Sequence, residues 1–229
     1  MKKKLGMLVY ENAQPIDFIG PWEVFSIWKN SLNAPIEMYL VSEQGSYVTC
    51  ANDIIVKTHF DFKNTPELDY LVVPGGVGRL QEVNNEKLIS FIVKQAKTSQ
   101  YILSICTGMF LLHKAGLLDN QFATTYWRAM PEAKLLPNIT IVEERMVKND
   151  KIWLSGGLSS GIDLAIEFIA ELAGNETAGK VQLLFEYFPK KPSYSNQESR
   201  HFLPPYYGHE NEEPANFPKY ISDSFKKDR

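Results

Sequence analysis

The sequence predicts an α/β protein built on a central, mostly parallel sheet with helices on both faces. Short apolar runs of strand length alternate along the chain with longer amphipathic segments, an alternation typical of parallel sheets covered by helices. Three of these runs are followed by a loop around Asp17, by Pro74-Gly75-Gly76, and by Cys106. Because ligands bind beyond the carboxyl ends of the strands in such sheets, we expect these three segments to form one site.

The first half of the chain supplies the predicted elements in order. The opening strand covers residues 5–9 and leads into a long loop over 10–19. A helix then begins at Gly20-Pro21, because a proline in the first helical turn loses no hydrogen bond, and it runs through Trp28. The next predicted elements are a strand over 36–42, a hairpin appended to the sheet over 47–50 and 54–56, a strand over 68–73 and a helix over 86–97.

A predicted strand over 101–105 stops abruptly at Cys106, and apolar residues at helical spacing follow from Met109 to Gly116. A strand that breaks into a helix at a nucleophilic residue is a nucleophile elbow. We expect the free N–H groups of that helix to make the Cys106 thiol ionise more easily than a free thiol. The Thr107 amide would then donate to an oxyanion beside the sulfur. The alternative is a small buried core cysteine, which the strand-end position disfavours.

The second half of the chain continues the pattern and then changes composition. We predict a strand over 122–127, a short helix over 128–135, a hairpin of 139–147 with 151–155 and a helix over 162–172 that ends at Gly174. Asn175 is the predicted N-cap of a last helix that reaches Phe188. Prolines are frequent beyond Pro189. We therefore assign residues 1–192 to one domain and 193–229 to a Pro-rich C-terminal tail that is too polar for a core of its own.

The composition is that of an ordinary globular protein, with 44% hydrophobic and 22% charged residues. A net charge of -3 and a pI near 5.9 give no sign of binding to nucleic acid or an acidic membrane. No segment approaches transmembrane length. The two cysteines, Cys50 and Cys106, have no metal-ligand companions nearby and no disulfide framework. We therefore expect a cytoplasmic protein without a metal.

Several segments in the same order along the chain resemble the DJ-1/PfpI superfamily, and within it the isonitrile hydratases of the cyclohexyl-isocyanide hydratase type. They are DFIGPWEVF (17–25), VPGG (73–76), SICTG (104–108), AGLLD (115–119), ATTYW (123–127), GGLSSGID (156–163) and EYFPKKP (186–192). The resemblance implies a flavodoxin-like sandwich, like that of class I glutamine amidotransferases, which usually forms a homodimer.

The resemblance also implies the roles of the site residues. Cys106 would be the nucleophile, Asp17 the acidic residue bonded to it, and Thr107 its hydroxyl neighbour. The Gly75-Gly76 turn and the Thr107 amide would bind developing negative charge; a simple turn is the alternative for the glycines. The implied activity is that of a hydro-lyase without metal or organic cofactor, which adds water to an isonitrile through a Cys106 thioimidate and releases an N-substituted formamide. Burial would raise the pKa of Asp17 enough for it to carry a proton near neutrality.

One residue departs from the family pattern. The subgroup usually has Thr-His-Trp where this chain has Thr125-Tyr126-Trp127, so Cys106 lacks the family histidine. His59 and His113 are expected to pack rather than to replace it, and this disfavours a Cys-His-acid triad. Four aromatic residues could line an apolar substrate pocket, with core packing as the alternative for each: Phe18, Trp22, Tyr126 and Trp127.

Three other functions are compatible with the resemblance. The same domain occurs as the ligand-sensing half of AraC-type transcription regulators, but the acidic chain and its Pro-rich end disfavour DNA binding. A redox-responsive protective protein would oxidise Cys106 instead of turning over a substrate. A hydrolase or glyoxalase-like activity is disfavoured by Tyr126. The partners we expect are a small-molecule substrate and a second copy of the chain.

Overall fold

The computed structural model describes residues 2–188, and within them the predicted fold class is confirmed. The central sheet has seven strands in the order β10-β11-β7-β6-β1-β2-β5. Only the β10–β11 pair is antiparallel. The strands are β10 (Met146–Lys148), β11 (Ile152–Ser155), β7 (Tyr101–Ile105), β6 (Tyr70–Val73), β1 (Lys3–Leu8), β2 (Ile36–Ser42) and β5 (Phe60–Asp61).

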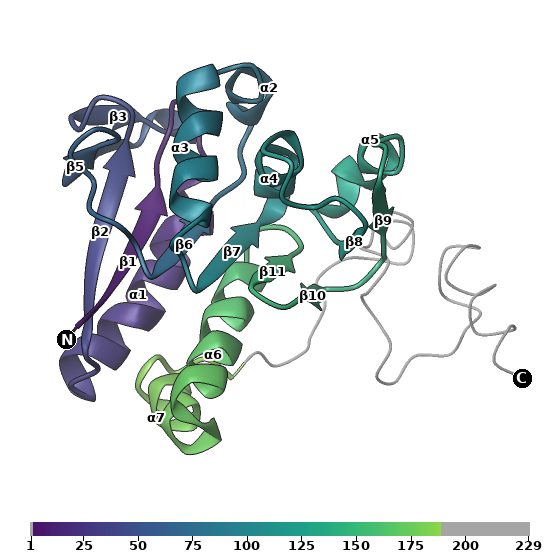
Figure 1. Cartoon of the computed structure of the whole chain (residues 1–229). Helices are drawn as coiled ribbons and strands as arrows, with labels where there is room; N and C mark the ends of the chain where they lie inside the picture. The colour runs from purple at the N-terminus through teal and green to yellow at the C-terminus, as the bar shows by residue number, and fades with distance from the viewer. Residues whose placement is uncertain (1, 189–229) are drawn as a thin grey trace, which may run out of the picture. The chain divides into compact units, whose positions relative to one another are not determined.

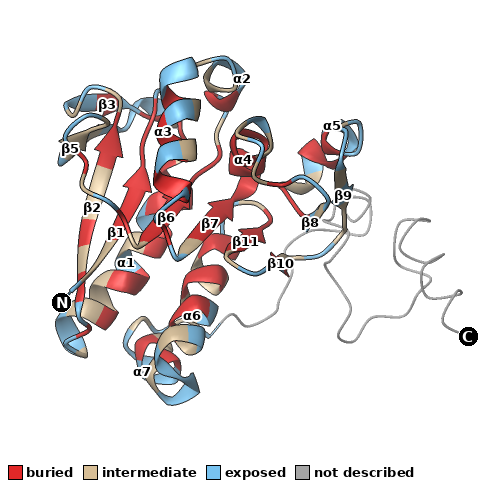
Figure 2. Ribbon diagram, in the orientation of Figure 1, coloured by how far each residue is buried: buried red, intermediate tan, exposed pale blue. Residues whose placement is uncertain are grey.

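Helices cover both faces of this sheet (Figure 1). One group packs together from α1 (Pro15–Ser31), α6 (Ser160–Ala173) and α7 (Asn175–Leu184). The other consists of α2 (Arg79–Glu82), α3 (Glu86–Ala96) and α4 (Met109–Lys114). The central strands β6 and β7 are buried almost throughout (Figure 2), as expected for strands enclosed by two helical layers.

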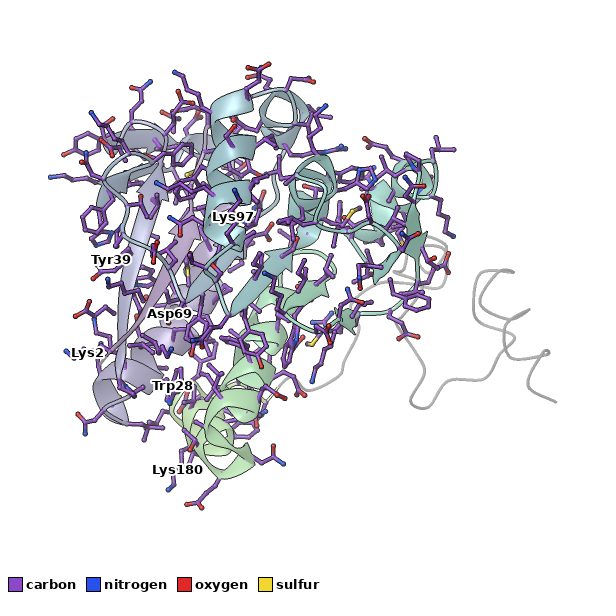
Figure 3. The ribbon with its side chains drawn as sticks, viewed as in Figure 1. Lys2, Trp28, Tyr39, Asp69, Lys97 and Lys180 are labelled. Atoms are coloured by element: carbon purple, nitrogen blue, oxygen red, sulfur yellow. The ribbon has the colours of Figure 1, made fainter. Side chains whose placement is uncertain are left out.

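Asp69 connects the amino-terminal ends of neighbouring strands, at the end of the sheet opposite the elbow. Its carboxylate accepts hydrogen bonds from Lys3 Nζ at 2.8 Å and from the Lys4 amide at 2.9 Å. Figure 3 shows this residue beside the first strand, while Lys180 points outward from α7. The Asp69 contacts hold the start of β1 against the start of β6. They thereby help to set the register of the two strands, including that of their carboxyl ends.

The first helix begins earlier than predicted. It starts at Pro15, not at Gly20-Pro21, and Pro21 lies inside it. Pro15 occupies a position where a missing N–H costs nothing, and its fixed φ suits the helix. Pro21 has no backbone N–H, so the interior of the helix lacks one hydrogen bond there. The correction matters for the site, because it moves Asp17 from the predicted loop into the first helical turn, where its position is fixed.

The strands predicted over 47–50, 54–56 and 122–127 do not join the central sheet. The hairpin of β3 (Tyr47–Thr49) and β4 (Ile55–Lys57) forms as predicted, with the short 3-10 helix η1 (Ala51–Asp53) between its strands, but as a separate two-stranded sheet. The strand predicted over 122–127 is β8 (Gln121–Ala123), which pairs with β9 (Ile139–Ile141). It ends early because the Thr124 and Thr125 hydroxyls donate to the carbonyls of Glu144 and Cys106, and such bonds compete with strand pairing.

The pairing of β9 with β8 also corrects the second predicted hairpin. Only β10 and β11 form it, over Met146–Lys148 and Ile152–Ser155. The predicted helix over 128–135 is present as the 3-10 turn η3 (Trp127–Ala129) followed by α5 (Met130–Ala133). The edge strand β5 and the single turn α2 were not predicted, since both are too short to show a period.

Gly174 ends α6 as predicted, with φ +84°, and it is also the N-cap of α7. The prediction of Asn175 as the cap was wrong, because Asn175 is already the first helical residue, and α7 stops at Leu184 instead of reaching Phe188. The predicted domain boundary at 192 and the Pro-rich tail over 193–229 lie outside the described residues. No helix within residues 2–188 is long and apolar enough to cross a bilayer.

Candidate active site

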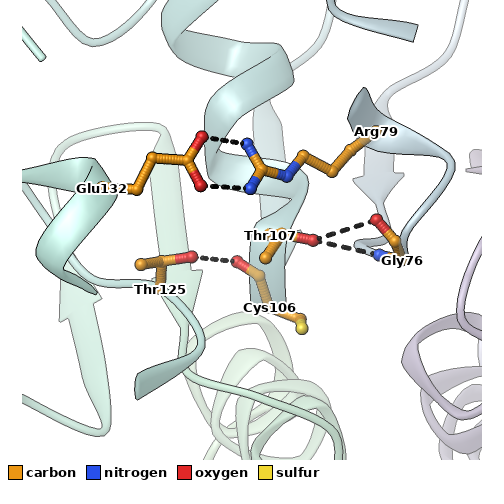
Figure 4. A network of polar contacts seen from close by, with 6 residues as sticks. All are labelled: Gly76, Arg79, Cys106, Thr107, Thr125 and Glu132. Atoms are coloured by element: carbon orange, nitrogen blue, oxygen red, sulfur yellow. Dashed lines mark hydrogen bonds and ion pairs between the residues drawn. The ribbon is translucent and has the colours of Figure 1, made fainter. Parts of the chain in front are cut away.

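Cys106 lies at the carboxyl end of β7, at the sharp break predicted from the sequence. Its φ is +59°, in the left-handed region that a residue other than glycine adopts only where its surroundings hold it there. Two hydrogen bonds do so. The Cys106 amide donates to the Gly156 carbonyl at 2.8 Å, and the Cys106 carbonyl accepts from Thr125 Oγ1 at 2.8 Å (Figure 4). The short helix η2 (Cys106–Gly108) then leads into α4.

The predicted glycine pair lies against this elbow. A Cβ atom on Gly75 would lie 2.5 Å from the Thr107 amide nitrogen and 2.9 Å from the Cys106 Cβ, so no other residue fits there. The Gly76 amide donates to Thr107 Oγ1 at 3.0 Å (Figure 4), and the Gly75 amide donates to Asp17 Oδ2 at 3.0 Å. Both glycine N–H groups therefore hold side chains of the site and are not free to bind a developing oxyanion.

Asp17 is fully buried at the start of α1. Burial raises the pKa of its carboxyl to about 7, although hydrogen bonding by the Gly75 amide, the Cys106 thiol and the Leu158 amide partly opposes this. Its second oxygen, Oδ1, is buried without a hydrogen-bond partner of normal geometry, which adds to the cost of ionisation. A pKa of about 7 leaves the Asp17 carboxyl about half protonated at neutral pH, and its role as a proton carrier stays a prediction.

The expectation of an easily ionised thiol is wrong. Burial, followed by the neighbouring Asp17 charge, raises the pKa of Cys106 well above the ordinary thiol value, even though the Thr107 and Leu158 amides favour the thiolate. The thiol is only 6% exposed, and α4 is too short a helix to overcome that loss of solvent. At neutral pH the resting pair is therefore a protonated Cys106 thiol beside an Asp17 carboxyl that is about half ionised.

A pocket of about 370 Å³ opens onto Cys106 and Thr107, within the range of small-molecule sites. Of the four aromatic residues predicted to line it, only Tyr126 does so. Phe18 is buried in the core, and Trp127 packs edge-on against Tyr126 without lining the pocket. Trp22 stacks on the ring of His59, with centroids 5.8 Å apart.

Tyr126, which replaces the family histidine, packs closely on the glycine loop after β11. A Cβ atom on Gly157 would lie 2.3 Å from the Tyr126 ring. Neither His59 nor His113 substitutes for the missing family histidine. His59 Nδ1 accepts from the Leu40 amide, and His113 Nε2 lies 2.9 Å from the Pro137 carbonyl. Among residues 2–188, the site thus combines a thiol and a carboxyl, and neither described histidine lines its pocket.

Two parts of the site were missed by sequence reasoning. Leu158, with φ +55°, directs its amide toward the Asp17–Cys106 pair; the quoted glycine-rich segment contains it but gave no reason to single it out. Arg79 and Glu132 form a paired hydrogen bond in the pocket wall (Figure 4), with Nη1–Oε1 at 2.6 Å. These residues are 53 positions apart, and no sequence signal links them.

No group of three or more His, Cys, Asp or Glu side chains in the described part of the chain is placed to hold a metal ion. The polar groups that the described residues bring to the site are a thiol, an adjacent carboxyl and the amides of Thr107 and Leu158.

Comparison with known proteins identifies the family of the chain. The family model described as DJ-1/PfpI family matches residues 3–171. The chain belongs to the DJ-1/PfpI family. Among its relatives is an isonitrile hydratase from Pseudomonas putida, 33% identical over 195 residues that cover 84% of this chain and 82% of the relative. The resemblance inferred from the motifs is thus confirmed.

The chain is also similar to a longer transcriptional regulator and to a solved structure. The HTH-type transcriptional regulator GbdR from Pseudomonas aeruginosa is 26% identical over 191 residues, which cover 81% of this chain but 51% of the regulator. A solved ThiJ/PfpI family protein from Pseudomonas syringae superposes with a TM-score of 0.77 at 23% identity, covering 99% of this chain and 86% of that protein. The last likeness supports the fold alone.

Proposed function

We propose that this member of the DJ-1/PfpI family hydrates an isonitrile to an N-substituted formamide, with Cys106 as the nucleophile and Asp17 as the proton carrier. The observation that carries the proposal is the buried pair itself: a protonated thiol against a carboxyl whose pKa is about 7, beneath a small-molecule pocket. The relationship to an isonitrile hydratase, at 33% identity, supports the same reaction.

The first step joins the thiol to the terminal carbon of the isonitrile. The Cys106 S–H bond breaks as Asp17 accepts its proton, the sulfur bonds to the isonitrile carbon, and Asp17 returns the proton to that carbon. The product is a thioimidate, R–N=CH–S–Cys. A carboxyl that is about half ionised at neutral pH suits this work, because it must first accept a proton and then donate it.

The second step releases the product. Water adds to the thioimidate carbon, one of its protons passes to nitrogen and the other to sulfur, and the C–S bond breaks. The net reaction, R–NC plus water to R–NH–CHO, returns the free thiol. The amides of Thr107 and Leu158 stabilise negative charge on the departing sulfur; the family resemblance implies such a role for the Thr107 amide and the Gly75-Gly76 turn.

The redox-responsive alternative is less well supported by this geometry. Oxidation to a sulfenate starts from an accessible thiolate, whereas burial keeps the Cys106 thiol protonated. A neutral thiol beside a proton acceptor suits a substrate that consumes the thiol proton during attack, as an isonitrile does.

We also propose that the chain works in the cytoplasm as a homodimer on a small-molecule substrate. Both cysteines are free and buried, which accords with a reducing compartment. Apolar side chains are exposed near the site, on the first two turns of α1 and in the loop that carries Leu158: Ile16, Ile19 and Leu158 are 37%, 38% and 41% exposed. Contact with a second copy would cover this surface.

The test is a direct assay of the purified protein against alkyl and aryl isonitriles, with formamide release followed by chromatography. Cys106→Ser should abolish turnover, since a hydroxyl there has no comparable means of losing its proton. Asp17→Asn keeps the size of the side chain but carries no exchangeable acidic proton, and turnover should fall by roughly a hundredfold. A correctly folded Asp17→Asn variant with near-native turnover would refute the proton-carrier role, and no turnover of any isonitrile by the wild type would refute the function.

A further inference from the structure

The wall of the pocket is unevenly charged. Apolar side chains line part of it, among them Val77, Leu80 and Leu158, while three charged residues line another part: Arg79, Arg128 and Glu132. Figure 4 shows the Arg79–Glu132 pair on the side of Thr107 away from the Cys106 sulfur. The pocket thus offers a ligand both charged and apolar contacts.

The charge of Arg79 is already balanced. Its guanidinium is held by both carboxylate oxygens of Glu132, and its carbon lies 4.0 Å from the centroid of the Phe110 ring. The side chain is only 10% exposed. A cation enclosed in this way, with its hydrogen-bonding fork occupied, is part of the wall rather than a free binding group.

The charge of Arg128 is not balanced by any described residue. Within residues 2–188 this exposed side chain makes no ion pair, and its one notable neighbour is the Trp127 ring, whose centroid lies 5.9 Å away. The three charged lining residues therefore leave one net positive charge, and that charge resides on Arg128.

We propose that the preferred substrate is an isonitrile with a carboxylate at the end remote from the reacting carbon, and that Arg128 binds this carboxylate. The inference rests on the proposed function and names its substrate class. A guanidinium matches a carboxylate with two parallel hydrogen bonds. The single net charge of the lining is balanced by a monoanion, whereas a phosphate would bring close to two charges. The apolar residues accommodate the hydrocarbon between the two ends.

The product follows from the chemistry of the substrate. Addition of water to an isocyano carboxylate forms a C–H and a C=O bond at the isonitrile carbon and an N–H bond at nitrogen. The product is an N-formyl amino carboxylate, whose remote carboxylate takes no part in the reaction and stays on Arg128 throughout. The role of Arg128 is thus one of specificity, expressed in KM and kcat/KM for anionic substrates only.

The experiment compares acids with their neutral esters in the intact protein. Initial rates are measured for 4-isocyanobutanoate and 6-isocyanohexanoate and for the methyl ester of each, at pH 7.5 and low ionic strength. The variant is Arg128→Gln. Its control is Lys114→Gln, which removes an equal charge from the exposed end of α4 without touching the pocket.

We expect the wild type to favour at least one acid over its ester by roughly tenfold in kcat/KM, the size of one solvent-accessible charge-assisted contact. Arg128→Gln should remove this preference, because it lowers kcat/KM for the acid and leaves kcat/KM for the ester unchanged. Lys114→Gln should keep the preference. Added salt should reduce the ratio of the acid's kcat/KM to that of the ester in the wild type. Turnover of the esters with no preference for either acid overturns the inference and leaves the proposed function standing. A preference that survives in Arg128→Gln also overturns it. Failure of all four compounds counts against both.

Discussion

Replacing Asp17 by Asn should make the protein more stable in mild alkali while it impairs turnover. The pKa of the buried carboxyl is about 7, against 3.8 for an ordinary aspartate. Because the folded-state pKa is raised, the protonated side chain favours the folded state fully below the unfolded pKa, and this advantage is lost as the pH rises from about 4 to 7. The folded-state pKa of about 7 against 3.8 for an ordinary aspartate corresponds to about 4 kcal/mol, because a tenfold change in an equilibrium constant is about 1.36 kcal/mol.

An asparagine at position 17 does not ionise, so this pH-dependent cost disappears. The measurement is urea unfolding of wild type and Asp17→Asn at intervals between pH 4 and pH 8, with free energies of unfolding extrapolated to water. The free-energy difference between variant and wild type should change by about 4 kcal/mol in favour of the variant across this range. Comparing the two pH values cancels any constant effect of the amide on packing.

Asp69→Asn provides a control of opposite sign. Burial alone would raise the pKa of Asp69, but its hydrogen bonds to Lys3 and to the Lys4 amide outweigh this and lower the pKa. Its stabilisation is therefore present above the unfolded pKa and is lost as the pH falls, so Asp69→Asn should lose most stability near neutrality. If the free energies of unfolding of wild type and Asp17→Asn changed with pH in the same way, the pKa of Asp17 would be that of an ordinary aspartate. The proposal that Asp17 carries a proton near neutrality would then be refuted.

Two further predictions concern the thiol and the assembly. Iodoacetamide should alkylate Cys106 roughly tenfold more slowly than free glutathione at pH 7.5, because the reagent needs a thiolate and burial disfavours the thiolate of Cys106. Peptide mapping by mass spectrometry distinguishes labelling of Cys106 from labelling of Cys50. Labelling of Cys106 faster than that of glutathione would contradict the raised pKa. Sedimentation at micromolar concentration should show a dimer that Ile16→Glu and Ile19→Glu weaken, while a monomeric wild type would count against the proposed interface.

The parts of the structure that depend on local pattern could be predicted from the sequence. The alternation of strands and helices located β6, β7 and α3 to within two residues. The site followed because the carboxyl ends of parallel strands meet at one edge, which brought Gly75 to Cys106 although 31 residues separate them. The start of α1 was missed because two prolines, Pro15 and Pro21, compete for the same first-turn signal.

The electrostatics of the site could not be predicted in the same way. Whether a thiol is activated depends on the balance between amide dipoles and lost solvent, and only the packed structure shows that burial of Cys106 prevails. The direction in which an aromatic side chain points is likewise set by its neighbours, so Trp22 meets His59 and not the pocket. The Arg79–Glu132 contact joins two short helical turns that have no recognisable period.

The bond from the Gly75 amide to Asp17 spans 58 residues of chain, and the bond from the Gly76 amide to Thr107 spans 31. The reactive pair is therefore assembled only when segments distant along the chain have docked, which makes it a property of the completed fold. Opening of this region separates Asp17 from Cys106 and so leaves a thiol without its proton acceptor. Turnover should therefore be lost whenever this region opens, even where the strands of the central sheet stay paired.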